Sequence, residues 1–361
     1  SAAKGRRCAI PDLSQSTHIQ FASLVCFGRY LNDRATSKGR ENRFPPFQSH
    51  FLGRKGIGMK SNGVLRNAQK YPVLYGMAIP VMAYFVLFHY MPMYGAVMAF
   101  QKYVPAKGIL GSNWVGLNNF VLFFQDIYCF RIIRNTFLIN LYGLLFGFPV
   151  PIIFALLLNE LRSGKFKRVA QTVTYMPHFI SAVVVCGLVK DFVSSDGVIT
   201  EIFSAITGQK TTNLLAKPNY FRSIYTAMNI WKTFGWSSII YFAALTSVNQ
   251  ELYEAAAIDG ANRFYQILHV SIPAILPTIA TMLVLRLGSM MSVGYEQIIL
   301  LYQPITYETA DVISSYVYRR GLQEFDYGYS AAVGLFNSVV NLVFILAANL
   351  SSKKLNGTSI W

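Results

Sequence analysis

Six long apolar segments, separated by polar stretches, make up most of the chain after residue 70. They cover residues 72–90, 132–158, 169–193, 221–248, 275–301 and 329–350. Each segment is close to or longer than the roughly 20 residues that an α-helix needs to cross the apolar part of a bilayer. The pattern therefore predicts an all-α integral membrane protein, in which a domain over residues 71–361 contains six transmembrane helices.

The polar stretch between the fourth and fifth segments, residues 249–273, has the composition of a helix pair. Glutamate and alanine at 254–257 favour a helix, and Gly260 provides a backbone that can turn sharply. A second helical piece over 262–270 should stop before Pro273, because proline disfavours helical geometry in the residue that precedes it. We therefore expect a short helix, a turn and another short helix that lie beside the membrane.

The same stretch resembles the EAA loop of binding-protein-dependent ABC importer permeases. The family pattern is Glu-Ala-Ala, three residues, Gly, nine residues, an aliphatic residue, one residue, an aliphatic residue and Pro. This sequence meets it with Glu254-Ala255-Ala256, Gly260, Val270, Ile272 and Pro273, of which Val270 and Ile272 are mild departures. In the family this loop is a cytoplasmic coupling helix that sits in a cleft of the ATPase subunit. The resemblance implies coupling roles for Glu254, Ala255, Ala256, Ala257, Asp259, Gly260, Ala261 and Pro273.

The resemblance also implies the assembly in which the chain works. A family pore combines this permease with a second, different permease subunit, two copies of a cytoplasmic ABC ATPase and an extracytoplasmic solute-binding protein. The sequence contains no GxxxxGK[ST] phosphate-binding loop. We therefore expect a non-catalytic pore subunit that binds no cofactor itself, with ATP and Mg on the partner ATPase. The segment YMPMYGAVMAFQK at 90–102 resembles the branch that imports polysaccharide fragments, which implies an oligosaccharide substrate.

Composition and charge agree with a membrane protein that has a basic tail. Hydrophobic residues make up 53% of the chain and charged residues 13%, which is too apolar for an ordinary soluble protein. Residues 1–70 hold 13 of the 32 Lys and Arg residues against only Asp12, Asp33 and Glu41. They predict a basic, largely disordered cytoplasmic tail, and no nucleic-acid partner, because no aromatic-basic module accompanies the charge. Met59 is the first methionine, so we expect the native chain to start there.

The distribution of charge predicts the orientation in the membrane. Six spans place both termini on one side, and the tail, the 159–171 loop and the Lys353-Lys354 end share that side with the 249–273 loop. Lys and Arg accumulate on the cytoplasmic side of bacterial membranes. We therefore expect both termini and the loop in the cytoplasm of a multi-pass protein of the bacterial inner membrane. The links on the opposite face carry the acids Glu308, Asp311, Glu324 and Asp326.

Two cations lie at membrane depth, where a charge is costly and usually functional. Lys232 is near the middle of the fourth segment and Arg286 near the middle of the fifth. In the maltose-type branch of the resembled family, sugar contacts come from the spans on either side of the EAA loop. The resemblance assigns the substrate path to Asn229, Lys232, Thr233 and Trp236 on one span, and to Arg286, Ser289, Met290 and Val293 on the other.

The same two cations indicate the charge of the substrate. Two buried cations that face one path repel each other unless an anion lies between them. The pattern therefore favours an acidic, uronate-containing oligosaccharide, on whose rings Trp236 could stack. In the alternative, Lys232 and Arg286 extend toward the membrane surface or pair with a partner subunit, and carry no information on the substrate.

Two other classes of protein remain as alternatives. An ATP-independent secondary transporter or channel would need an inverted repeat or proton-relay acids in the spans, and Glu296 is the candidate acid. A membrane anchor or assembly protein would not need cations inside the membrane. Co-purification with an ATPase, followed by substrate-stimulated ATP hydrolysis, distinguishes the importer from both.

Overall fold

The computed structural model describes residues 71–161, 164–208 and 212–356. The predicted basic tail, residues 1–70, lies outside the described residues. By its internal contacts the chain divides into two units, Ser1–Tyr75 and Gly76–Trp361. Of the first unit only residues 71–75, where the first described helix begins, are described. The features below belong to the second unit, apart from the start of that helix.

The described part of the chain is almost entirely helical, in agreement with the predicted fold class. The exception is a two-stranded antiparallel sheet, in which Gln101 faces Trp114 and Lys102 faces Asn113. Up to the end of the second long helical stretch, the elements are α3 (Pro72–Phe85), η1 (Val86–Tyr90), α4 (Met91–Met93), η2 (Tyr94–Phe100), β1 (Gln101–Lys102), η3 (Pro105–Lys107), α5 (Gly108–Gly111), β2 (Asn113–Trp114), α6 (Asn118–Gln125), α7 (Cys129–Tyr142), η4 (Gly143–Gly147) and α8 (Pro149–Glu160). They are followed by α9 (Lys165–Tyr175), η5 (Met176–Phe179), α10 (Ala182–Phe192), α11 (Val198–Thr207), η6 (Leu214–Ala216), α12 (Pro218–Thr246), α13 (Gln250–Ile258), α14 (Arg263–Gln266), η7 (Ile267–Ser271) and α15 (Ile272–Gly288). The last elements are α16 (Tyr295–Leu301), η8 (Pro304–Thr306), α17 (Tyr307–Ala310), α18 (Ile313–Tyr318), η9 (Arg319–Gln323) and α19 (Tyr327–Asn356).

Four helical stretches in the described residues are long and apolar enough to cross a membrane: Tyr75–Phe100, Cys129–Glu160, Arg263–Gly288 and Tyr327–Ser351. A fifth is added if the helices Lys165–Phe179 and Ala182–Phe192 form one span that is bent by 99°. Helix α12 has 29 residues and is long enough, but its stretch of Asn229, Lys232 and Thr233 makes it more polar than the four. The described chain thus shows four or five apolar spans, and the predicted count of six depends on α12.

The third predicted span, residues 169–193, is not one straight helix. Its first part, α9, passes into the turn η5, and α10 starts after the sharp bend. Pro177 lies in this turn, and the Ser181 side chain caps α10 by accepting a hydrogen bond from the Val184 N–H at 3.3 Å. Proline at the turn and a serine at the helix start are both local causes of a break. The apolar pattern predicted one continuous span here and did not predict the bend.

The fifth predicted span is displaced toward the N-terminus by the structure. Helices α14 and α15 are joined by η7 into one helical run through Pro273, so the predicted stop before this proline is wrong. The π-turn η7, in which Ile272 donates to the Ile267 carbonyl, provides the wider turn that accommodates a residue without an N–H. The run ends at Gly288, where an added Cβ would lie 2.9 Å from the Ile345 side chain of α19. Residues 295–301 form the separate helix α16.

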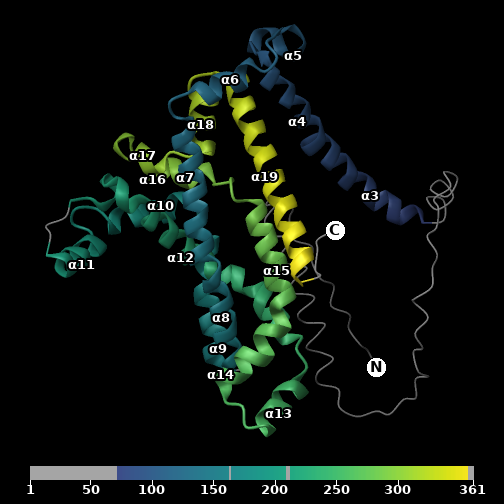
Figure 1. Cartoon of the computed structure of the whole chain (residues 1–361), viewed down its shortest axis with the longest axis vertical. Helices are drawn as coiled ribbons and strands as arrows, with labels where there is room; N and C mark the ends of the chain where they lie inside the picture. The colour runs from purple at the N-terminus through teal and green to yellow at the C-terminus, as the bar shows by residue number, and fades with distance from the viewer. Residues whose placement is uncertain (1–70, 162–163, 209–211, 357–361) are drawn as a thin grey trace, which may run out of the picture. The chain divides into compact units, whose positions relative to one another are not determined.

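Helix α12 lies at the centre of the second unit and packs against α8, η4, α9, η5 and α15. At Gly235 an added Cβ would lie 2.1 Å from the Thr174 carbonyl oxygen, so glycine allows α12 and α9 to touch through their backbones. Figure 1 shows α6 and α18 at one end of this unit and α13 at the opposite end. The candidate functional residues lie in three places: at the end with α6 and α18, at the end with α13, and on the helices between these ends.

Candidate functional site

The predicted helix pair of the 249–273 loop is present, and each helix has its own cap. The Asn249 side chain accepts a hydrogen bond from the Glu251 N–H at 3.1 Å at the start of α13. The Asn262 side chain accepts one from the Tyr265 N–H at 2.9 Å at the start of α14. Between them Gly260 has a φ of +84°, a conformation that side chains disfavour. The sequence therefore predicted the first helix, the turn and the start of the second helix correctly, but not the end of the second helix.

The first of these helices is exposed and is held at few points. Glu254 and Ala257 are exposed, and the apolar side chain of Ile258 is 86% exposed. A hydrogen bond of 2.9 Å between the Tyr253 and Ser271 hydroxyls ties α13 to η7. Because η7 continues into α15, this hydrogen bond connects α13 with a long apolar helix. Of the remaining predicted coupling residues, Ala255, Ala256, Asp259 and Ala261 also lie in the pair, whereas Pro273 lies in α15.

The predicted path residues of α12 form part of a longer polar face. Arg222, Tyr225, Asn229, Lys232 and Trp236 follow the i, i+3, i+7 spacing of one helix side. Thr233, also predicted, uses its hydroxyl to bond the Asn229 carbonyl at 2.7 Å. The sequence analysis missed Arg222, although the same spacing, extended by two turns toward the start of the helix, would have found it.

The two predicted cations lie in different surroundings. Lys232 lies within electrostatic reach of His178 and Cys186. Arg286 approaches Gly143, where an added Cβ would lie 2.7 Å from its Nη2 atom, and it interacts with Tyr225. Tyr225 and Lys232 are seven residues apart on α12, so the two positions are separated by about 10 Å along the helix. Lys232 and Arg286 therefore lie at two different heights along the polar face of α12.

The aromatic and C-terminal members of the predicted path also have structural partners. The ring of His178 lies flat against that of Trp236, with centroids 4.7 Å apart and an interplanar angle of 2°. One face of the indole predicted to stack on sugar is therefore already covered. Because α15 ends at Gly288, the residues beyond it do not continue the helical face of Arg286. Ser289 caps the helix end, and Met290 and Val293 are buried, with exposures of 3% and 9%.

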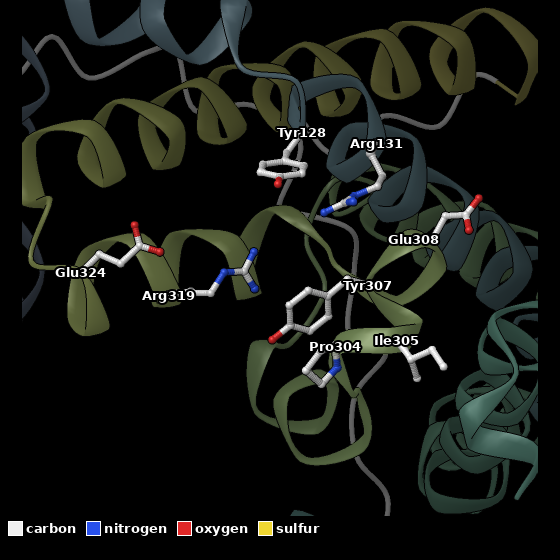
Figure 2. A pocket seen from close by; sticks show the side chains of 8 residues that line it. All are labelled: Tyr128, Arg131, Pro304, Ile305, Tyr307, Glu308, Arg319 and Glu324. Carbon is white, nitrogen blue, oxygen red and sulfur yellow. The ribbon is translucent and has the colours of Figure 1, made fainter.

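At the opposite end from α13, an open pocket of about 460 Å³ lies between α7, α17 and η9 (Figure 2). Its lining contains two aromatic rings, two arginines and two glutamates. The Arg131 guanidinium lies over the Tyr128 ring at 4.5 Å, and that of Arg319 over the Tyr307 ring at 4.8 Å. The lining residues are Tyr128, Arg131, Pro304, Ile305, Tyr307, Glu308, Arg319 and Glu324.

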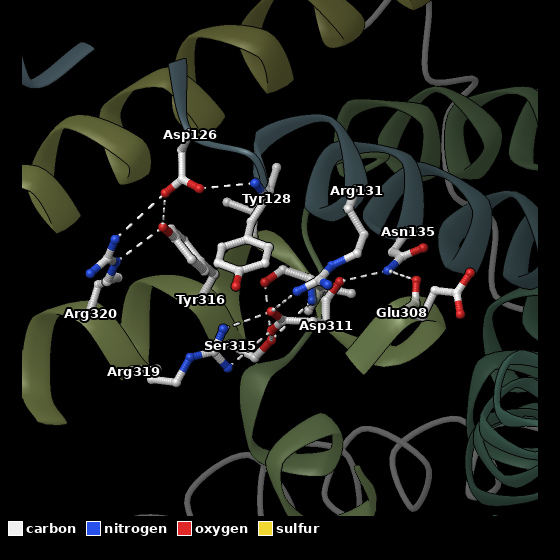
Figure 3. Close-up of polar contacts among 12 residues, drawn as sticks. Asp126, Tyr128, Arg131, Asn135, Glu308, Asp311, Ser315, Tyr316, Arg319 and Arg320 are labelled. Atoms are coloured by element: carbon white, nitrogen blue, oxygen red, sulfur yellow. Dashed lines mark hydrogen bonds and ion pairs between the residues drawn. The ribbon is translucent and has the colours of Figure 1, made fainter. Parts of the chain in front are cut away.

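Asp311 holds the floor of this pocket together (Figure 3). Its side chain is fully buried and receives Arg319, whose Nη2 lies 2.7 Å from Oδ2 and whose Nη1 lies 3.4 Å from Oδ1. Arg131 approaches the same Oδ2 at 3.7 Å, and the Ser315 hydroxyl donates to Oδ1 at 2.8 Å. A buried carboxylate requires this degree of pairing. Asp311 had been interpreted only as an acidic marker of the outer face.

A buried amide connects the pocket floor with the polar face of α12. The Asn135 side chain donates to the Asp311 carbonyl at 3.0 Å and to the Glu308 carbonyl at 2.9 Å. Its Oδ1 accepts a hydrogen bond from Arg222 Nη2 at 2.8 Å. Polar groups therefore run without interruption from the pocket floor through Asn135 to the first turns of α12. This connection was not predicted, because its partners are far apart in sequence.

A second carboxylate, Asp126, anchors the neighbouring edge. It accepts hydrogen bonds from the hydroxyls of Tyr316 and Tyr329 and from the Tyr128 N–H, and it pairs with Arg320 at 3.6 Å. Burial by itself would raise the pKa of Asp126, but these hydrogen bonds and the arginine charge outweigh it, so the pKa lies below its ordinary value. Asp126 is thus a structural anion that joins α6, α18 and α19.

The chain is similar in sequence to characterised bacterial proteins over most of its length. It is 43% identical to Protein LplB of Bacillus subtilis (strain 168) over 282 residues, 78% of this chain and 88% of that protein. It is 42% identical to the polygalacturonan/rhamnogalacturonan transport system permease protein YteP of the same strain, over 81% of this chain and 91% of that protein. The likeness thus covers more than three quarters of this chain.

A solved structure and a family match extend this result to the fold. A chain in the crystal structure of a bacterial ABC transporter involved in the import of the acidic polysaccharide alginate superposes with a TM-score of 0.74. The two chains are 45% identical, and the alignment covers 81% of this chain and 99% of that one. Residues 147–357, more than half of the chain, match the family described as binding-protein-dependent transport system inner membrane component. The chain belongs to this family and is a membrane permease of the carbohydrate ABC importer type.

Proposed function

We propose that this chain is the permease subunit of an ATP-driven importer that moves an acidic oligosaccharide from a solute-binding protein into the bacterial cytoplasm. The observation that carries the preference for acidic sugars is the cationic face formed by Arg222 and Lys232 of α12 and by Arg286 of α15. In the described part of the chain, none of the three forms an ion pair with a carboxylate. Arg222 is hydrogen-bonded to the neutral Asn135 amide, and cations that lack a carboxylate partner favour an anion passing between them.

The characterised relatives support this substrate class. The solved relative takes part in the import of the acidic polysaccharide alginate, and YteP is described as a polygalacturonan/rhamnogalacturonan permease. A further crystal structure shows the alginate transporter in complex with a periplasmic protein bound to an alginate pentasaccharide. By analogy, a solute-binding protein delivers a carboxylate-bearing oligosaccharide to the end of this chain where the pocket lies.

We further propose that α13 is the cytoplasmic coupling helix. It would insert into a cleft of an ABC ATPase, two copies of which bind ATP and Mg, while a second permease subunit completes the pore. The exposed side chains of Leu252 and Ile258 provide an apolar contact surface. The helical run from α14 to α15 carries the motion of the ATPase to the level of Arg286. In this arrangement α12 also crosses the membrane and, with the four apolar spans and the bent pair, brings the number of spans to six. Both termini then lie in the cytoplasm.

The alternative, an ATP-independent secondary transporter or channel, has less support. Proton-coupled transport requires acids inside the spans, and Glu296 is exposed at the start of α16. The family to which the chain belongs is dependent on binding proteins, which is the pattern of an ABC importer. Coupling to an ATPase remains the property that separates the two functions.

The proposed function is tested by purifying the chain with its co-expressed partners and measuring ATP hydrolysis in proteoliposomes. A solute-binding protein loaded with an acidic oligosaccharide should stimulate hydrolysis and uptake, whereas the same protein without sugar should stimulate neither. A matched oligosaccharide whose carboxylates are methyl-esterified should be transported more slowly. If the chain purifies without an ATPase, or if uptake proceeds without ATP, the protein is an ATP-independent transporter or channel instead.

A further inference from the structure

We infer that the pocket formed by Tyr128, Arg131, Tyr307 and Arg319 is a separate binding site that receives one carboxylate-bearing sugar unit before the chain of sugars enters the spans. This inference rests on the proposed function, because it assigns the first contact of the same substrate.

Arg131 has hydrogen-bonding capacity that its neighbours leave unused. Arg319 donates hydrogen bonds of 2.7 Å and 3.4 Å to Asp311, whereas the nearest Arg131 nitrogen lies 3.7 Å from the same carboxylate. Among the described residues the Arg131 side chain makes no hydrogen bond, and because its Nε is buried, the two Nη groups are the donors that a ligand could meet. A guanidinium presents five donors in a planar fork that matches a carboxylate. Arg131 is therefore the group in the pocket that an incoming carboxylate would complete.

The surrounding side chains suit a sugar ring. Figure 2 shows the guanidinium groups of Arg131 and Arg319 and the rings of Tyr128 and Tyr307 around the same space, with Glu308 and Glu324 at its two ends. Glu324 is itself paired with Arg320 at 2.6 Å, so its charge is already engaged. The Tyr307 ring is covered by the Arg319 guanidinium and stacks on Tyr302 with centroids 4.8 Å apart, so Tyr128 is the ring that offers an apolar wall beside the arginine donors, a combination that pockets for small molecules use.

The dimensions favour a small molecule over a protein surface. A volume of about 460 Å³ lies within the range of roughly 300 to 1,000 Å³ that is typical of ligand pockets. Protein partners instead bury roughly 800 Å² on each side of a flatter interface. The pocket is thus suited to one or two sugar units, while a solute-binding protein would contact the rim around it.

The position of the pocket explains why a substrate would stop there. Asp311, the buried carboxylate that pairs with both arginines of the pocket, is bound through Asn135 to Arg222, the first cation of the α12 face. A sugar chain held at Arg131 would have its next units close to the start of that face. The site therefore provides a point of transfer between the binding protein and the span helices.

The test measures binding of trigalacturonate to the complete purified transporter in nanodiscs, without the solute-binding protein. Its fully methyl-esterified form serves as the neutral probe. Arg131→Gln should weaken trigalacturonate binding about tenfold or more, because a charge-assisted pair is lost, and should leave binding of the ester unchanged. Tyr128→Leu, which removes the ring under Arg131, should weaken both probes. Arg168→Gln, on exposed α9, is the matched control and should change neither.

Thermal stability, docking of the binding protein and ATP-driven uptake decide between the outcomes. Thermal unfolding midpoints equal to that of the unmodified protein show that each variant folds, and Arg131→Lys, which keeps the charge but not the fork, should bind at an intermediate level. Unchanged trigalacturonate binding in folded Arg131→Gln would overturn the inference, even if ATP-driven uptake proves normal. Weaker docking of the sugar-free binding protein with unchanged sugar binding would identify the pocket as a protein contact. Failure of the unmodified transporter to couple ATP to uptake would refute the proposed function instead.

Discussion

The guanidinium of Arg222 donates a hydrogen bond of 2.8 Å to the side chain of Asn135, and this contact links the first turns of α12 to the segment that carries Asp311. Asn135 is fully buried and its amide also bonds two carbonyls of the segment that carries Asp311. One amide thus fixes α7, α12 and the start of α17 relative to one another. Any rearrangement that opens this end must either carry the three elements together or break these bonds.

Replacement of Asn135 by alanine should therefore destabilise the fold and slow uptake together. Three hydrogen bonds are lost and Arg222 is left with a buried, unpaired donor, so the free energy of unfolding should fall by about 2 to 3 kcal/mol. Denaturant unfolding in detergent measures this loss. Asn118→Ala, at an exposed position, is the control. A variant as stable as the unmodified protein would contradict the proposed role of the amide.

Asp311→Asn should be among the most harmful single changes in the outer network. It removes the buried anion that Arg319 and Arg131 share, and breaking a buried ion pair costs about 3 to 5 kcal/mol. We expect a strongly lowered thermal midpoint and poor membrane yield, which fluorescence-detected size exclusion can follow. Glu296→Gln, which neutralises an exposed acid, should stay within about 0.5 kcal/mol of the unmodified protein.

The lowered pKa of Asp126 predicts a specific response to acid. Its carboxylate is held charged by Tyr316, Tyr329, the Tyr128 N–H and Arg320, against the effect of burial, so its pKa in the folded chain lies below the ordinary 3.8. The stabilisation is present above the pKa of the unfolded chain and is lost as the pH falls through that of the folded chain. Unfolding midpoints measured from pH 7 down to pH 3 should show this decline. Asp126→Asn should be less stable at pH 7 and should show a flatter decline.

Gly260→Val should separate ATP hydrolysis from transport. The φ of +84° at this position is unfavourable for a β-branched residue, so the turn between α13 and α14 should change its course. The spans, which pack elsewhere, should remain folded. We expect the assembled complex to hydrolyse ATP with little or no uptake. Gly187→Ala, where an added Cβ meets open space in α10, is the control. Normal uptake by Gly260→Val would argue against a coupling role.

Lys232→Ala tests the charge preference inside the spans. Removal of this cation should reduce uptake of an acidic oligosaccharide at least tenfold more than uptake of its methyl-esterified form, since only the former loses an ionic contact. Thr233→Ala, one position further on α12, removes a hydroxyl that bonds the Asn229 carbonyl and leaves the charge in place. Equal losses for the two substrates would show that Lys232 serves packing or a partner subunit.

The sequence by itself determined the features that depend on neighbouring residues. The helix pair of the 249–273 loop follows from Asn249, Asn262 and Gly260, whose effects on capping and turning act within a few positions. The apolar segments predicted the membrane class for the same reason, since hydropathy is a local property. The number of spans does not follow from hydropathy alone, because α12 carries polar side chains in its middle.

Only the tertiary structure decided where helices bend or end and which polar groups meet. Gly288 ends α15 beside Ile345, 57 positions later, and Asn135 binds carbonyls more than 170 residues away. Such pairings are chosen by how helices pack, and no local propensity encodes them. The buried partners of Asp311 and Arg222 were therefore invisible in the sequence, because the cost of burying a charge selects its neighbour in space and not along the chain.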